Sequence, residues 1–422
     1  MACVEKFAVL ARRYPQSAYA GLTKSLQMQW QYTQHVVPSC SAKFAPIEKA
    51  LRESFLPALF QIETIDDDFR RRLALSVKQG GLGIPNPVAT ADGHHQDSLR
   101  CTRMLTESLL EDPANFNVRK YKQECSNQRH KAADARREAG VSEFDSLQVG
   151  CSLAERRRIQ RSTSTGGWLT VTPSDANGTT LAANEFRDSL LLRYGLRPHN
   201  LPERCDGCKA PFTVNHAMCC PKGGLIGIRH DEMKMEWHSI CAQAFKPSRV
   251  TDEPEIHSGR GPILVQNADG MSAALPETRG DIGVHGFYER AVTTIFDVSI
   301  CDTDCVSYRN MDPAQVLVNR EKAKKKKHLA ACLAQRRTFT PLVFSVDGLR
   351  AKETNAACKH VAAKLAAKWN RSYSDVCGYV HSRLSIALVR SASLCLRGAR
   401  DPLARCTHPF LEDGAGLSAY RA

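Results

Sequence analysis

Four potential metal ligands in a short segment constrain the fold of this chain more than any other feature. They follow the spacing C-x2-C-x7-H-x3-C and are Cys205, Cys208, His216 and Cys220. Zinc takes four ligands of this kind in a tetrahedron, and a two-residue gap lets backbone amides face the first pair of thiolates. Turn residues surround the motif, with Asp206-Gly207 inside it and Lys222-Gly223-Gly224 after it. The pattern therefore predicts a structural zinc knuckle.

The fourth ligand has two candidates, because Cys219 directly precedes Cys220. We favour Cys220 and keep Cys219 as the alternative. A simpler interpretation, buried free cysteines beside an unrelated histidine, stays open at this stage. The chain holds 17 cysteines, an odd number, and its first residues lack the apolar segment of a signal peptide. We therefore expect reduced thiols in a nuclear or cytoplasmic protein.

The charge of the chain points to its partner. The 422 residues carry a net charge of +14, and the isoelectric point is near 9.1. Such a balance favours a polyanion, and nucleic acid comes before a membrane surface because no long basic amphipathic helix is evident. No apolar run approaches the roughly 20 residues that cross a bilayer. The length predicts two or three domains.

Two short β-branched segments carry one aspartate each among apolar neighbours. Asp281 lies in residues 277–284 and Asp297 in residues 293–300, with a short glycine-containing link between them. The pattern predicts two strands in a hairpin. A carboxylate among isoleucine, valine and phenylalanine is costly unless a cation meets it. A lysine-rich helix around residues 320–328 follows, so these acids predict a divalent metal site for phosphodiester cleavage. Edge or turn aspartates are the simpler alternative.

Apolar periodicity predicts a mostly helical chain around these strands. Helices are expected within residues 8–60, 88–165, 182–194, 229–245, 353–369 and 375–396, and a third strand over residues 340–348. Glu253 lies in an extended segment before the aspartate strands and is a candidate accessory metal ligand. A solvated acid is the alternative for Glu253.

The order of these segments carries a family resemblance. In chain order they are Tyr14-Pro15-Gln16-Ser17-Ala18-Tyr19-Ala20-Gly21, Phe55-Leu56-Pro57-Ala58-Leu59, Gly80-Gly81-Leu82-Gly83-Ile84, the knuckle, His230-Asp231-Glu232 and the two aspartate strands. The series resembles the C-terminal part of site-specific non-LTR retrotransposon reverse transcriptase polyproteins. In that family a thumb-like region and a Cys-Cys-His-Cys knuckle precede a restriction-like endonuclease of the PD-(D/E)xK superfamily.

The resemblance implies an α+β fold with a helical N-terminal half, a zinc knuckle and a PD-(D/E)xK-like α/β nuclease core. The implied divisions are a helical thumb-like region (1–87), a basic helical linker region (88–200), the zinc knuckle (201–224), a restriction-like endonuclease domain (225–400) and a tail (401–422). The chain contains no polymerase Tyr-x-Asp-Asp signature. The polymerase palm is therefore not expected in this chain.

The resemblance also implies site residues. Asp281 and Asp297 would hold catalytic Mg²⁺, with Glu253 as an accessory acid. The family's first acid usually follows proline, whereas this chain has Arg279-Gly280-Asp281. That departure bears on whether the nuclease is active.

The catalytic lysine of the family lies on the helix after the second strand, in a Lys-x-x-Lys-Tyr setting. Here that setting corresponds to Lys324, Lys327 and, with histidine for tyrosine, His328. The apolar face of the helix is expected to comprise Leu329, Cys332 and Leu333. Helical phase then favours Lys322 or Lys325. We select Lys324 and retain Lys327, while a solvated basic face or a nuclear import signal is the alternative.

The function that the resemblance implies is that of a retrotransposon-derived DNA endonuclease fragment. It would bind DNA and element RNA and nick target DNA by Mg²⁺-dependent phosphodiester hydrolysis, which supplies a primer for reverse transcription. The alternative is a catalytically inactive, zinc-containing nucleic-acid-binding remnant.

Overall fold

The computed structural model describes residues 1–111, 116–257, 264–266, 272–274 and 278–401. The chain divides after Gly195 into two compact units. It is mostly helical and contains a small mixed four-stranded sheet, so the fold class is α+β. The predicted tail falls, apart from its first residue, on residues 402–422, outside the described residues.

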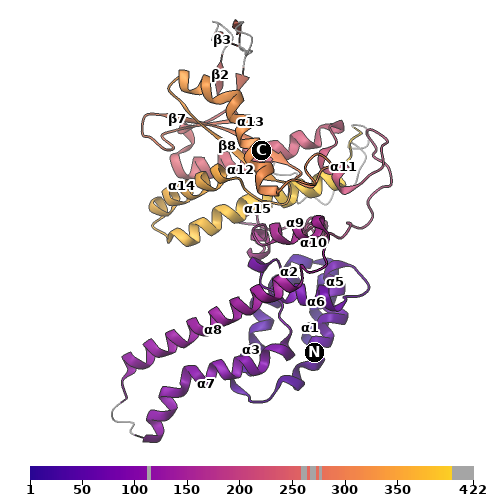
Figure 1. Ribbon diagram of the computed structural model, residues 1–422, viewed down its shortest axis with the longest axis vertical. Coiled ribbons are helices and arrows are strands. Elements are labelled where there is room, and N and C mark those ends of the chain that lie inside the picture. The colour runs from indigo at the N-terminus through magenta and orange to yellow at the C-terminus, as the bar shows by residue number, and fades with distance from the viewer. Residues whose placement is uncertain (112–115, 258–263, 267–271, 275–277, 402–422) are drawn as a thin grey trace. The chain divides into compact units, whose positions relative to one another are not determined.

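The first unit, residues 1–195, is helical throughout its described part. Its helices are α1 (Ala2–Arg13), α2 (Pro15–Gly21), η1 (Leu22–Leu26), α3 (Gln27–Val36), η2 (Ser41–Phe44), α4 (Ala45–Ala50), η3 (Leu51–Phe55), α5 (Leu56–Phe60), α6 (Asp67–Ala74), η4 (Val77–Gln79), α7 (Pro87–Glu111), α8 (Val118–Ser146), α9 (Leu153–Ser162), η6 (Gly167–Thr170) and α10 (Ala183–Tyr194). Proline at the first position starts α2 and α7, where its missing N–H costs nothing. The long helices α7 and α8 lie side by side (Figure 1).

The second unit contains all the strands of the described residues. Its helices are α11 (Val214–Cys219), η7 (Lys222–Gly224), α12 (Leu225–Phe245), η8 (Pro247–Arg249), α13 (Pro313–Ala334), α14 (Lys352–Trp369) and α15 (Tyr373–Arg397). Its strands are β1 (Val250–Asp252), β2 (Glu255–His257), β3 (Leu264–Gln266), β4 (Ser272–Ala274), β5 (Thr278–Arg279), β6 (Ile282–His285), β7 (Thr293–Cys301) and β8 (Thr338–Ser345).

The main sheet runs in the order β1-β6-β7-β8. The predicted hairpin is confirmed: β6 and β7 are antiparallel, with Ile282 opposite Phe296. β7 and β8 are parallel, from Thr294 opposite Thr338 to Cys301 opposite Ser345. Parallel neighbours need a crossover connection, and α13 supplies it. The aspartate-bearing strand β7 is therefore an inner strand of the sheet.

Helices cover both faces of this sheet (Figure 1). Phe296 and Val298 of β7 pack into the core that α12, α14 and α15 complete. Ile295 and Cys301 pack on the other face, against residues of α13. Because side chains alternate along a strand, Asp297 belongs to the face that α13 covers.

Asp281 was predicted to lie in a strand, but in the structure it lies between two strands. Gly280 and Asp281 separate β5 from β6, and the Asp281 amide donates to the Phe296 carbonyl at 3.0 Å, one residue out of the β6–β7 register. A Cβ atom at Gly280 would lie 2.3 Å from Cγ2 of Ile295. The backbone therefore approaches β7 closely at this point, and the regular ladder begins only at Ile282.

The aromatic core of the second unit predicts a large cost for truncating Phe296. Its side chain is fully buried, and its ring lies 5.5 Å from that of Trp237 and 4.8 Å from that of Phe287. We expect Phe296→Ala to lower the free energy of unfolding by about 3–5 kcal/mol. Urea denaturation followed by tryptophan fluorescence measures this. The control Leu333→Ala, on the exposed side of α13, should change it by less than about 0.5 kcal/mol; equal losses would contradict the assigned core.

Candidate functional site

The four predicted zinc ligands converge in the second unit. Their ligand atoms all lie within 4.8 Å of one another. The Sγ atoms of Cys205 and Cys208 are each 3.9 Å from Sγ of Cys220, and Sγ of Cys208 is 3.4 Å from Nε2 of His216. Ligands about 2.3 Å (sulfur) and 2.1 Å (nitrogen) from a common tetrahedral centre would be roughly 3.6–3.8 Å apart. The cluster can therefore hold a metal ion such as zinc.

Local hydrogen bonds position these ligands. Lys209 takes a left-handed conformation with φ of 63°, and its amide donates to the Cys205 carbonyl at 2.9 Å, which closes the first turn. The Thr213 hydroxyl accepts from the His216 amide at 3.1 Å and starts α11. Burial raises the pKa of Cys205, but hydrogen bonds from the backbone of Cys208 and from His216 outweigh it and leave the pKa at about 6. The Cys205 thiol is thus readily ionised near neutral pH.

Cys219, the alternative fourth ligand, is not part of the cluster. Burial of its thiol and nearby Asp302 raise the pKa of Cys219 to about 11, which disfavours the thiolate that a metal requires. Burial raises the pKa of Cys220 as well, so the choice of Cys220 over Cys219 rests on position.

The second candidate centre joins β7 to α13. Asp297 is only 6% exposed, and Nζ of Lys324 lies 2.6 Å from its Oδ2. The lysine charge offsets the free-energy cost of burying the Asp297 carboxylate. The structure thus brings together Asp297 and the lysine selected from the sequence.

Asp281 belongs to the same centre. Its Oδ2 accepts the Val298 amide at 2.5 Å, one residue after Asp297, and lies 3.0 Å from Nε2 of His230. Burial raises the pKa of Asp281, but His230 first and then the Val298 amide and Lys324 outweigh burial and lower it. The hydrogen bond with Asp281 raises the pKa of His230. The two carboxylates therefore contact two basic side chains, His230 from α12 and Lys324 from α13.

The sequence analysis named the segment His230-Asp231-Glu232 but did not assign His230 to the site. His230 lies in α12, and its Nδ1 is 3.2 Å from Oδ1 of Asp231. Its contact with Asp281 could not be predicted from local sequence, because Asp281 lies 51 residues further on. Only its position in a helix that packs on the aspartate strands could have suggested it.

The apolar face expected for α13 is confirmed at Leu329 and Cys332 and is wrong at Leu333. Leu333 is 57% exposed, whereas Glu321 and His328 are buried. The Oε1 atom of Glu321 accepts the Glu353 amide at 2.9 Å and so caps the start of α14. Polar side chains thus line the buried face of α13, and Lys324 lies on it with them.

The side chains of the other predicted site residues are exposed or pair with residues other than the two aspartates. Lys327 is exposed, and Lys322 is too. Nζ of Lys325 contacts Oε1 of Glu353 at 2.5 Å. Glu253 is 60% exposed at its side chain and contacts Lys234 at 3.0 Å, although its amide donates to the Asp281 carbonyl. Among the described residues, the cysteine cluster is the one group of three or more such ligands that converges, so Glu253 does not complete a site with the aspartates.

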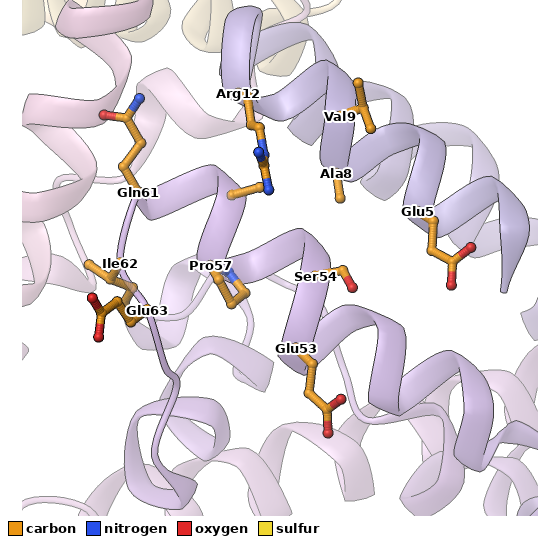
Figure 2. Close-up of a pocket in the computed structure, with 11 residues that line it drawn as sticks. Glu5, Ala8, Val9, Arg12, Glu53, Ser54, Pro57, Gln61, Ile62 and Glu63 are labelled. Carbon is orange, nitrogen blue, oxygen red and sulfur yellow. The ribbon is translucent and has the colours of Figure 1, made fainter.

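A groove in the first unit is a poor alternative site. It has a volume of about 640 Å³ and lies between α1 and the segment formed by η3 and α5 (Figure 2). Glu5, Glu53 and Glu63 line it, together with Arg12. In Figure 2 the three acids point in different directions rather than toward a common point. They do not form a metal site or a catalytic pair.

The fold and the cysteine cluster define an α+β protein with a Cys3His site that can bind a metal ion. The chain matches no protein-family model and no curated protein. In the segments that the structure describes, no helix has the length and apolar character needed to span a membrane. The chemistry of the two centres therefore carries the functional argument.

The cluster geometry predicts that Cys220 is needed for zinc and Cys219 is not. We expect wild type and Cys219→Ser to carry about one zinc ion per chain and Cys220→Ser to carry almost none. Mass spectrometry of the metal content of the purified proteins measures this. A zinc-specific chelator should lower the melting temperature of wild type and Cys219→Ser but not that of Cys220→Ser. Loss of zinc from Cys219→Ser would contradict the assignment.

The His230–Asp281 contact predicts a pH window of stabilisation. Because the pKa of His230 is raised in the folded state, its contact with Asp281 stabilises the fold below about pH 6.5. This contribution is lost as the pH rises through the pKa of His230 in the folded protein. Because the pKa of Asp281 is lowered in the folded state, its contacts stabilise the fold above about pH 3.9. This contribution is lost as the pH falls through the pKa of Asp281 in the folded protein. We expect His230→Gln to cost about 1 kcal/mol near pH 5.5 and less at pH 9.

Urea denaturation in buffers without divalent cations measures this difference. The matched control is His238→Gln, on the same helix α12, which should show no such pH dependence. An equal loss for His230→Gln at both pH values would refute the ion pair.

Proposed function

We propose that this chain is a nucleic-acid-binding protein with a Mg²⁺-dependent DNA endonuclease centre at Asp281, Asp297 and Lys324. The observation that supports it most is the contact of Lys324 with the buried Asp297 at 2.6 Å, beside a second carboxylate bonded to the neighbouring Val298 amide. Two acids and a lysine from a strand pair and the next helix match the set expected from the retrotransposon resemblance. In that setting the protein would nick target DNA in the nucleus to prime reverse transcription.

The donor set fits a hard divalent cation. Mg²⁺ prefers carboxylate oxygens and water and is often held by only one or two carboxylates. Among the described residues, Asp281 and Asp297 make their side-chain contacts through Oδ2, which leaves Oδ1 of each as a ligand atom. Bound Mg²⁺ would supply neutralisation of the scissile phosphate and a lower pKa for an attacking water.

The protein's own side chains would orient the two carboxylates and stabilise charge at the phosphate. The Val298 amide fixes the Asp281 carboxylate toward β7. Lys324 holds a positive charge beside Asp297, where it would offset charge that develops on the phosphate during cleavage. His230 donates to Asp281 and orients it, in the manner of groups that support metal ligands from behind. The basic balance of the chain and the zinc knuckle would hold the nucleic acid backbone.

The inactive remnant is the competing proposal, and one observation favours it. Both carboxylates already have a basic side chain as a partner, and no third acid converges on them among the described residues. Such a centre has partners for its carboxylates without Mg²⁺. The remnant would bind nucleic acid with a steep salt dependence and would not cleave it.

A plasmid-nicking assay separates the two proposals. We expect the wild type to nick supercoiled DNA with Mg²⁺ and not without it. Asp297→Asn, Asp281→Asn and Lys324→Met should each lower the rate by at least about 100-fold. The matched control is Lys327→Met, from the same helix but exposed, which should retain nearly the full rate.

Equal traces of nicking in all these proteins would indicate contamination and would reject the endonuclease. Unchanged binding of DNA in that case would favour the remnant. A loss of nicking in Lys327→Met with retention in Lys324→Met would instead move the catalytic lysine to position 327.

A further inference from the structure

Unit 1 contains a cluster of arginines with buried N–H groups that lack an acceptor among the described residues. Arg193, the penultimate residue of α10, is 7% exposed, and in that part of the chain its Nε and Nη1 have no hydrogen-bond partner. Its Nη2 donates to the Val77 carbonyl at 3.2 Å. Arg72 of α6 has buried Nε and Nη2 atoms that are also without a partner among the described residues. Four buried guanidinium N–H-bearing atoms are thus unsatisfied in one region.

The ring of Tyr194 brings these arginines together. The Cζ atom of Arg72 lies 4.9 Å from its centroid, and that of Arg193 lies 6.0 Å from it. A ring face attracts a cation but does not satisfy the N–H groups at the edge of the guanidinium. The Tyr194 hydroxyl is buried beside Arg193 and has no acceptor of its own among the described residues. The shared aromatic platform therefore leaves several donors available.

A third arginine adjoins the cluster. Arg158 packs so closely on Gly195 that a Cβ atom there would lie 2.0 Å from Nη1 of Arg158. Burial first, and then Arg193 and Arg158, lower the pKa of Arg72 against the opposing effect of Tyr194. Like charges are thus close enough to repel one another. Such a group is costly unless an anion meets it.

No carboxylate fills this role for Arg72 or Arg193 among the ion pairs of the described residues. Glu155 interacts electrostatically with Arg158 and Arg72, but its Oε2 accepts the amide and the hydroxyl of Ser152 at 2.8 and 2.7 Å, in the capping box of α9. Its carboxylate is therefore committed to the helix start. Within the described part of the chain, the cluster is thus open to an anion from outside it.

We propose that Arg72, Arg158 and Arg193 form a binding site for a phosphate group. Guanidinium forks match the oxygens of phosphate in two parallel hydrogen bonds, which favours phosphate over a spherical anion such as chloride. Arg72 and Arg158 are partly exposed and give the site its access to solvent, while Arg193 forms its buried end. The +14 charge of the chain makes a backbone phosphate of nucleic acid the favoured source, with free phosphate as the other source of the same chemistry.

Thermal unfolding of the full chain in sodium phosphate and in sodium chloride at equal ionic strength tests the site. We expect phosphate to raise the melting temperature of wild type by several degrees over chloride. Arg193→Met and Arg72→Met should lose this difference, and Arg193→Met should be no less stable than wild type in chloride because a buried charge is removed. The control Arg71→Met should keep it, since Arg71 is exposed on the same helix and pairs with Glu143.

Equal melting temperatures in the two salts would overturn the proposal, and so would a phosphate effect that persists in both variants. If Arg193→Met does not fold, the wild-type comparison and Arg72→Met still decide. The result does not depend on nicking, because the endonuclease residues lie in the other unit.

A fluorescent single-stranded oligonucleotide identifies the source of the phosphate. With a backbone phosphate, Arg72→Met weakens binding and reduces the slope of log affinity against log salt by about 0.7, and inorganic phosphate competes with the oligonucleotide. With free phosphate as the ligand, the thermal effect stands while oligonucleotide affinity is unchanged. Either result supports the phosphate site.

Discussion

The burial of Asp297 in an inner strand is the constraint on which the second unit depends. Phe296 and Val298, its neighbours in β7, fill the core that α12, α14 and α15 complete. β7 therefore cannot shift by one residue, because a shift would exchange these side chains with the acid. The acid has to face α13, and α13 has to supply a cation there. Lys324 does so, and the parallel pairing of β7 with β8 fixes the crossover helix that carries it.

The knuckle is tied to the same core through the end of α15. The carboxylate of Asp206, inside the first ligand turn, accepts the amides of Arg400 and Asp401 at 2.5 and 3.0 Å. The guanidinium of Arg400 is buried, donates to the carbonyls of Ala217 and Cys395, and lies 5.0 Å from the ring centroid of Phe212. The folded knuckle therefore holds the chain after α15 in place.

Local patterns predicted the elements of this unit better than their contacts. The spacing of the four ligands was sufficient for the cluster, since ligands so close in sequence have few alternative arrangements. The β-branched segments predicted β7 and the hairpin, but not the irregular backbone at Asp281, which follows from the tight approach of Gly280 to Ile295. Helical phase identified Cys332 and Leu329 on the buried face of α13 but not Glu321 and His328, because hydrophobicity does not mark buried polar residues. The contacts of Glu253 and His230 could not be predicted, because each residue contacts a partner that is distant in sequence.

The two centres of the second unit differ in how they balance charge, and this decides how each would depend on a metal. Asp281 and Asp297 contact His230 and Lys324, so each carboxylate already has a basic side chain as its partner. A divalent ion would enter that centre by displacing or sharing existing contacts, and the fold around it would persist without the ion. The cysteine cluster has no such substitute in its ligand set: its atoms converge at 3.4–3.9 Å, and Cys205 is readily ionised. A thiolate at that position gains its compensating charge most directly from a bound cation. The cysteine cluster is therefore the centre whose structure would gain from a bound metal ion, whereas a metal at the aspartate centre would serve chemistry alone.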